Sequence, residues 1–129
     1  ILMKTILNIS FIFIISIITN DISAQNEYLA RSWPNGNPMV VYFLESGSQE
    51  ILKEQVFYKN GQLDYEGSYE SGVEHGFWTY YWENGSMKSQ EFYQNGLEEG
   101  TMYDYDKLGD KHTEYIYTRG VLVSKTSIN

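Results

Sequence analysis

The chain has 129 residues, no cysteine and a formal net charge of −8. This length fits one domain or one short repeat array, and without cysteine there are no disulfide cross-links and no thiolate chemistry. The acidic balance argues against nucleic acid and against anionic membrane surfaces, because both attract proteins through basic patches.

Residues 1–24 have the pattern of a secretory signal peptide. Lys4 precedes an apolar stretch over residues 6–18, and the small-residue site Ile22-Ser23-Ala24 follows it. This order is typical of a signal peptide, and the apolar stretch is shorter than the roughly 20 residues that cross a bilayer. We expect cleavage after Ala24, no membrane span in the mature chain, and a periplasmic, outer-membrane-associated or extracellular protein. An uncleaved membrane anchor is the alternative.

Glycines divide the rest of the chain at regular intervals. Two interleaved series each show gaps of 25, 24 and 24 residues; they are Gly36, Gly61, Gly85, Gly109 and Gly47, Gly72, Gly96, Gly120. A fixed spacing of this kind indicates a repeat architecture. Each unit of about 24 residues contains two glycine turns, so the pattern predicts one β-hairpin per unit.

Four of these glycines follow an asparagine. Asn-Gly pairs favour two-residue type I′ hairpin turns, in which both central residues have positive φ. We therefore predict type I′ turns at Asn60-Gly61, Asn84-Gly85 and Asn95-Gly96, and also at Asn35-Gly36. Longer loops or bulges are expected at the other four glycines, which follow Ser46, Ser71, Leu108 and Arg119.

An aromatic residue stands three positions before most of these glycines. The eight residues at this position are Trp33, Leu44, Tyr58, Tyr69, Trp82, Tyr93, Asp106 and Tyr117. The matching column Tyr69, Tyr93 and Tyr117 predicts a row of rings across neighbouring strands. Segments between turns alternate with period 2 in places, as in Gly76, Trp78 and Tyr80.

The expected fold is all-β: an elongated antiparallel meander of six to eight short strands, built from tandem β-hairpin repeats and preceded by the signal-peptide helix. Residues 25–32 form an N-terminal lead-in, residues 33–123 the repeat domain and residues 124–129 a C-terminal tail.

The segment "GVEHGFWTYYWENGSMKSQEFYQNGLEEGTMYDYD" resembles the MORN-repeat variant of bacterial proteins. The matching positions are Gly72, Gly76, Trp78, Tyr81, Asn84, Gly85, Tyr93, Gly96 and Gly100. The resemblance covers roughly residues 33–123. It implies an elongated hairpin sheet and, because similar proteins are labelled YwqK-like antitoxins, a role in a toxin–antitoxin pair.

No pattern in the chain predicts an enzyme or a cofactor site. A nucleophile usually needs a neighbouring histidine as its base, and His75 and His112 are both interpreted as solvated strand residues. Residues 104–115 place Asp104 and Asp106 at calcium-loop positions, but Leu108 and Tyr115 stand where oxygen ligands are required. No metal site is therefore predicted.

The aromatic residues are the candidates for binding. Twelve Tyr, three Trp and six Phe are more than one thin sheet needs for its turns. One interpretation places them in the core, Trp78, Trp82 and Phe92 above all. The other is an exposed aromatic face with an acidic rim, as in recognition surfaces. The candidate binding residues are Phe77, Trp78, Tyr80, Tyr81, Trp82, Tyr103 and Tyr105.

The sequence thus predicts an exported, non-enzymatic MORN-like repeat protein that binds another protein or a cell-envelope polymer. An antitoxin or immunity protein with a basic toxin as partner is the first alternative. A lipid- or glycan-binding module is the second. Self-association through the edge strands is a further expectation.

Overall fold

The computed structural model describes residues 26–128, so the expected signal peptide lies outside the described residues. The ten strands are β1 (Asn26–Ser32), β2 (Pro38–Leu44), β3 (Ile51–Phe57), β4 (Leu63–Glu70), β5 (Val73–Tyr81), β6 (Met87–Gln94), β7 (Leu97–Glu98), β8 (Gly100–Tyr105), β9 (Lys111–Thr118) and β10 (Val121–Ser127).

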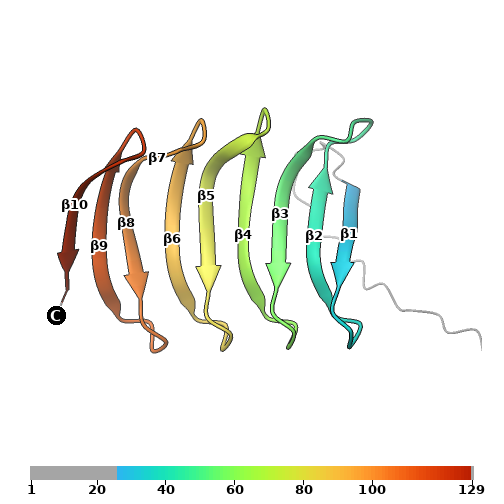
Figure 1. Cartoon of the computed structure of the whole chain (residues 1–129), viewed down its shortest axis with the longest axis horizontal. Helices are drawn as coiled ribbons and strands as arrows, with labels where there is room; N and C mark the ends of the chain where they lie inside the picture. Colours follow the sequence, from blue (N-terminus) through green and yellow to red (C-terminus); the bar gives the residue numbers. More distant parts are fainter. Residues whose placement is uncertain (1–25, 129) are drawn as a thin grey trace, which may run out of the picture.

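The strands form one antiparallel meander in the order β1-β2-β3-β4-β5-β6-β8-β9-β10 (Figure 1). The short strand β7 pairs with β6 and is separated by one residue from β8, which also pairs with β6. The expected all-β meander of hairpins is confirmed. It has more strands than the six to eight expected, because β1 lies in the predicted lead-in and β10 runs into the predicted tail.

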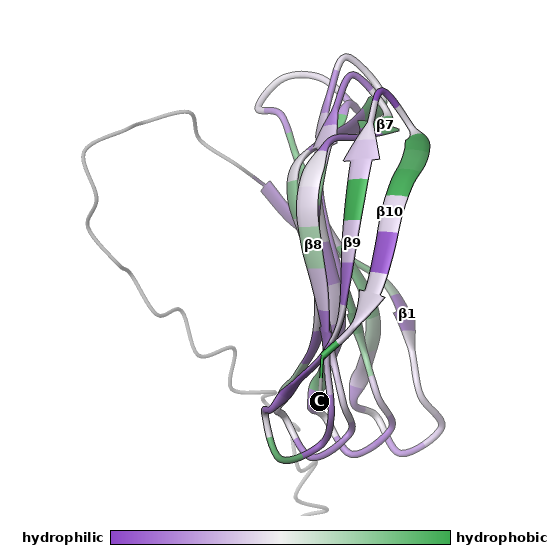
Figure 2. Ribbon diagram, turned by 90° about the vertical axis from the view of Figure 1, so that its left-hand side faces the viewer, coloured by the Kyte–Doolittle hydropathy of each residue, from purple (hydrophilic) through white to green (hydrophobic). Residues whose placement is uncertain are grey.

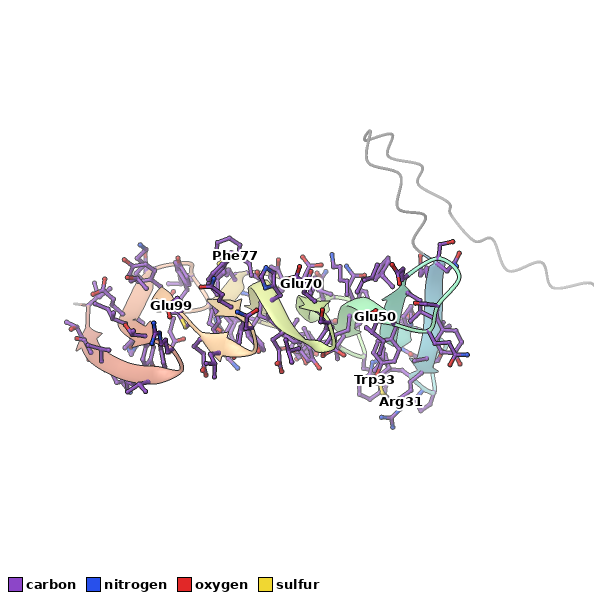
Figure 3. The ribbon with its side chains drawn as sticks, turned by 90° about the horizontal axis from the view of Figure 1, so that it is seen from above. Arg31, Trp33, Glu50, Glu70, Phe77 and Glu99 are labelled. Atoms are coloured by element: carbon purple, nitrogen blue, oxygen red, sulfur yellow. The ribbon has the colours of Figure 1, made fainter. Side chains whose placement is uncertain are left out.

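The sheet is a single layer within residues 26–128. Figure 2 shows it from the side as a thin, curved ribbon, and Figure 3 shows Phe77 extending from one face and Arg31 and Trp33 from the other. Only three apolar side chains of the described part are buried, those of Val41, Trp78 and Met102. A layer with so small a core depends on backbone pairing and on side-chain contacts within each face.

The loops at the lower end of the sheet in Figure 1 contain three residues each: 34–36, 59–61, 83–85 and 107–109. In the third loop, Trp82 N donates to Ser86 O at 2.8 Å and Gly85 N donates to Trp82 O at 2.8 Å. Only the glycine of each lower loop has positive φ. This is a type I turn followed by a glycine bulge. The type I′ prediction is therefore wrong at Asn60-Gly61 and Asn84-Gly85, and also at Asn35-Gly36.

Two-residue turns lie at the upper end of the sheet, at residues 71–72, 95–96 and 119–120. Both central residues have positive φ in each of them, with φ of 53° at Ser71 and Asn95 and 50° at Arg119. The type I′ prediction is confirmed at Asn95-Gly96. The longer loops expected after Ser71 and Arg119 are absent: Glu70 pairs with Val73 and Thr118 with Val121, so only two residues remain in each turn.

The repeated asparagines connect each lower loop to the next one. Asn84 Oδ1 accepts from the backbone N–H of Ser86 at 3.0 Å, while its amide nitrogen donates to Lys107 O at 3.1 Å. The same side-chain bond joins Asn35 to Lys59 and Asn60 to Glu83. In each case a backbone carbonyl of the following loop receives a hydrogen-bond donor from the asparagine of the preceding loop.

The aromatic residues that precede these loops form a second row of bonds. Their side chains donate to a backbone carbonyl of the next hairpin, in the pairs Trp33 Nε1 to Phe57 O (2.9 Å), Tyr58 Oη to Tyr81 O (2.8 Å) and Trp82 Nε1 to Tyr105 O (3.1 Å). We call the asparagine and aromatic bonds together the loop ladder. It explains why both residue types recur with the period of the repeat.

The last lower loop ends the ladder. It has Asp106 in place of the aromatic residue and Leu108 in place of the asparagine. The Asp106 carboxylate accepts from the backbone N–H groups of Leu108 at 2.8 Å and Asp110 at 3.1 Å. These bonds lower the pKa of Asp106. The loop therefore satisfies its own backbone, and Leu108 is 88% exposed.

Trp78 forms the main packing centre. Its side chain is 6% exposed, its Nε1 donates to Ser68 O at 3.2 Å, and its ring covers Gly67. Three tyrosine rings surround it, with centroids at 5.3 Å (Tyr69), 6.0 Å (Tyr93) and 6.1 Å (Tyr65). A side chain at position 67 would overlap the indole, so glycine is required there by close approach.

We predict that Asn84→Ala lowers the free energy of unfolding by about 1–2 kcal/mol, because the bond to Lys107 O and the bonds within the loop are lost. The matched control is Leu108→Ala at the same place in the last loop, where the change should stay within about 0.5 kcal/mol. Urea unfolding measures both. Equal effects of the two substitutions would contradict a stabilising role for the loop ladder.

We also predict that Gly67→Ala and Trp78→Ala are strongly coupled. Trp78→Ala should cost roughly 3–5 kcal/mol through lost packing, and Gly67→Ala about 1–3 kcal/mol through overlap with the ring. In the double variant the indole is absent, so the cost of Gly67→Ala should largely disappear. Strictly additive costs in a double-mutant cycle would refute this packing.

Candidate functional site

The strand register assigns each side chain to one of the two faces. Residues directly opposite each other on paired strands share a face, and so do residues two apart on one strand. Tyr65 pairs with Tyr80, Tyr80 with Ser89, and Ser89 with Asp104. Extending these pairs over the sheet places eight of the twelve tyrosines on one face, which we call the tyrosine face: Tyr28, Tyr42, Tyr65, Tyr69, Tyr80, Tyr93, Tyr115 and Tyr117.

The predicted column Tyr69, Tyr93 and Tyr117 lies on this face. Tyr69 and Tyr93 do not stack directly on each other, however, because the Trp78 ring stands between them in edge-on contact with both. The predicted row of tyrosines is therefore continued by a tryptophan: Trp78 on β5 lies between Tyr69 on β4 and Tyr93 on β6.

The seven predicted binding residues do not form one surface. Trp78 and Tyr80 belong to the tyrosine face, whereas the register assigns Phe77, Tyr81 and Tyr103 to the opposite face. Trp82 and Tyr105 adjoin the lower loops. Trp78 is also buried, so it supports the face from within and offers little surface to a ligand.

Several of the predicted aromatics already contact lysines of the chain. Lys88 Nζ and Lys107 Nζ lie 4.9 and 5.5 Å from the centroid of the Trp82 ring, and Lys111 Nζ lies 3.6 Å from that of Tyr103. These are cation–π contacts.

The opposite face contains an ion pair between two neighbouring strands. Lys53 Nζ lies 2.7 Å from Glu66 Oε2, which also accepts from Gln55 Nε2 at 2.9 Å. Phe77 is 61% exposed there and makes an edge-on contact with Phe92, with the centroids 5.1 Å apart. The ion pair joins β3 to β4, and the register places four further carboxylates on the same face: Glu27, Asp64, Glu70 and Glu114.

Carboxylates accompany the tyrosines on the tyrosine face. The register places five there: Glu54, Glu74, Glu91, Glu98 and Asp104. The two strand residues with positive side chains that it assigns to this face, Arg31 and Lys125, lie on the outermost strands β1 and β10. The middle of the face therefore has a negative potential that the sequence order does not reveal.

Tyrosine hydroxyls donate to two of these carboxylates. Tyr93 Oη lies 3.0 Å from Glu91 Oε2, and Tyr115 Oη lies 2.8 Å from Asp104 Oδ2. Burial, followed by the nearby Glu54, raises the pKa of Tyr65 to about 12, and burial with Glu91 raises that of Tyr80 to about 12. These hydroxyls stay protonated at neutral pH and serve as donors.

A hollow of about 280 Å³ opens on this face near the C-terminal end of the sheet. Its lining includes Ser89, Glu91, Glu98, Met102, Asp104, Tyr115 and Tyr117. Burial raises the pKa of Glu91, and repulsion from Glu98 and Asp104 adds to the effect, while the bond from Tyr93 opposes it. The hollow thus concentrates negative charge between aromatic walls.

The hollow arises from differences between successive repeat units. One unit earlier, the equivalent places 24 residues back hold Tyr65, Gly67, Trp78 and Tyr80; here they hold Ser89, Glu91, Met102 and Asp104. Three large aromatic side chains are replaced by smaller ones. The space that the Trp78 cluster fills in its own unit is consequently open in the next.

The two histidines lie on different strands. Nδ1 of His75 on β5 is 3.2 Å from Glu70 Oε2 without forming a hydrogen bond, and Nδ1 of His112 on β9 is 2.8 Å from Thr113 Oγ1. Neither contact assembles a nucleophile with its base.

Across residues 26–128, no three His, Cys, Asp or Glu side chains converge as metal ligands. Within residues 26–128 there is no helix that could span a bilayer.

Comparison of the chain with protein-family models and with curated proteins finds no match to either. The fold and the site define the protein as a single-layer, all-β sheet of tandem hairpins with one tyrosine- and carboxylate-rich face.

We predict that Glu91→Gln stabilises the protein at pH 7 by a few tenths to about 1 kcal/mol, allowing for solvent screening. Glutamine keeps an acceptor for Tyr93 and removes the repulsion from Glu98 and Asp104. Because the folded-state pKa of Glu91 is raised, its carboxylate opposes folding only where it is ionised. The gain should therefore vanish as the pH falls below about 4, where unfolded glutamic acid is protonated.

Urea unfolding over a pH series tests this prediction. Glu114→Gln, which removes one charge from the opposite face of β9, is the control and should show no comparable pH-dependent gain. Loss of stability in the Glu91 variant at pH 7 would mean that its surroundings favour the carboxylate.

Proposed function

We propose that this protein is an exported, non-enzymatic interaction module whose tyrosine face binds another protein or a cell-envelope polymer. The observation that supports the proposal most directly is the gathering of eight tyrosines and five carboxylates on one face of a single-layer sheet. Faces of this kind combine large, rigid contact groups with polar tips, as recognition surfaces do.

The export part of the proposal rests on the signal-peptide pattern of residues 1–24. The binding part rests on the distribution of charge: the opposite face pairs Lys53 with Glu66, whereas the carboxylates of the tyrosine face are accompanied mainly by tyrosine hydroxyls. Uncompensated charge on one face steers encounter with a partner of opposite charge.

An antitoxin or immunity role is the second candidate. The spacing of glycine, asparagine and aromatic residues resembles the MORN-repeat variant, to which antitoxin-labelled proteins are similar. A negative tyrosine face would fit a basic toxin. This candidate differs from the first in its site of action, because an antitoxin meets its toxin inside the producing cell.

A reporter fusion separates the two candidates. The full chain joined to a phosphatase that is active only outside the cytoplasm should give activity, and deletion of residues 1–24 should abolish it. Equal activity of both fusions, or none from either, would contradict export.

A face-swap comparison, in which the same charge reversal is made on one face of the sheet and then on the other, tests the binding surface. Protein purified after expression of the full chain should retain a subset of solubilised envelope components, and Glu98→Lys on the tyrosine face should lose them. Glu114→Lys makes the same charge change on the opposite face and should retain them. Equal retention by both variants would assign binding to another surface.

A further inference from the structure

The hollow beside Met102 on the tyrosine face is lined by three carboxylates. Met102, which is 4% exposed, lines it together with Tyr115 and Tyr117. Glu91, Glu98 and Asp104 also belong to its lining. In the preceding unit the same place is closed by Trp78 over Gly67.

We propose that this hollow receives the ammonium group of a lysine side chain from a partner protein, an inference that rests on the proposed function of the tyrosine face. The occupant is identified by charge complementarity, because three neighbouring carboxylates repel each other until a cation enters. An ammonium group offers three donors, enough to reach several of these carboxylates at once.

The walls suit the rest of a lysine side chain. Its apolar stem packs against methionine and aromatic carbon while the charged head meets the polar rim, and tyrosine rings attract a cation over their faces. The sheet shows the same preference within its own chain, where Lys125 Nζ lies 5.2 Å from the centroid of the Tyr115 ring.

The spacing of carboxylates extends the inference to the sequence of the partner. Glu54 lies on β3, Glu74 on β5 and Glu98 on β7, which pairs with β6, so these three carboxylates of the tyrosine face recur at every second strand position. Glu91 on β6 and Asp104 on β8 add further carboxylates near Glu98. Neighbouring strands are about 4.8 Å apart, and a chain in the polyproline II conformation advances about 3.1 Å per residue with three residues per turn. A segment in this conformation that crosses the strands therefore presents every third side chain to the sheet at about the spacing of two strands, which predicts a Lys-x-x-Lys pattern.

The test uses a fluorescent twelve-residue peptide with lysine at every third position and glycine or serine elsewhere. Its anisotropy is measured with protein purified after expression of the full chain. We expect saturable binding that is lost when the lysines carry Nε-acetyl groups. Met102→Trp restores the residue of the preceding unit and fills the hollow without changing charge, so it should weaken binding at least about tenfold.

Glu91→Gln provides a second variant if Met102→Trp does not fold, and it should also weaken binding severalfold. Glu114→Gln, with the same loss of charge on the opposite face, should bind within about twofold of the parent, as expected for a distant screened charge. Urea unfolding and circular dichroism confirm that each variant keeps its sheet.

Each other outcome overturns part of the inference. Equal weakening by Glu91→Gln and Glu114→Gln, with no effect of Met102→Trp, would mean diffuse attraction with no lysine site. Tighter binding of an arginine peptide, or of spermidine, would show that the hollow prefers that cation to lysine. Failure of the lysine peptide to bind, while the face-swap comparison still shows retention, would refute this inference and leave the proposed function intact.

Discussion

The structure depends on backbone pairing between successive strands, reinforced by side-chain hydrogen bonds that run from one hairpin to the next. A single-layer sheet buries few apolar side chains, here Val41, Trp78 and Met102 among the described residues, so hydrophobic burial alone orders its units weakly. The loop ladder orders the units relative to one another, as packing against a second layer of structure would otherwise do. Asn60 and Tyr58 bond to carbonyls of the following hairpin, and each unit fixes the position of the next one.

The same repetition produces the tyrosine face and then interrupts it. Trp78 closes the face over Gly67 in one unit, and Met102 leaves a hollow in the next, although the backbone follows the same course through Gly76 and Gly100 with φ of 78° and 87°. A repeat protein can vary one side chain per unit without altering its neighbours. The binding site that we propose lies where one unit departs from the pattern of the unit before it.

Much of the fold could be predicted from the sequence, but the candidate site could only partly be predicted. The aromatic pairs at Phe77-Trp78 and Tyr80-Tyr81 show that two faces are involved, yet β5 has three residues opposite Gly67. A bulge of this kind changes which residue meets which partner. The contact of Tyr115 with Asp104, eleven residues away, likewise depends on how β8 pairs with β9.

The sequence by itself determined the period, the strands and the places where the chain reverses, because glycine spacing and turn chemistry act over a few neighbouring residues. Only the tertiary structure decided the turn types and the composition of each face. Asn84 does not adopt positive φ as a turn residue of its own hairpin, since its amide is more stable when it bonds to Lys107 O in the next loop. That contact spans 23 residues, and local propensity carries no information about it.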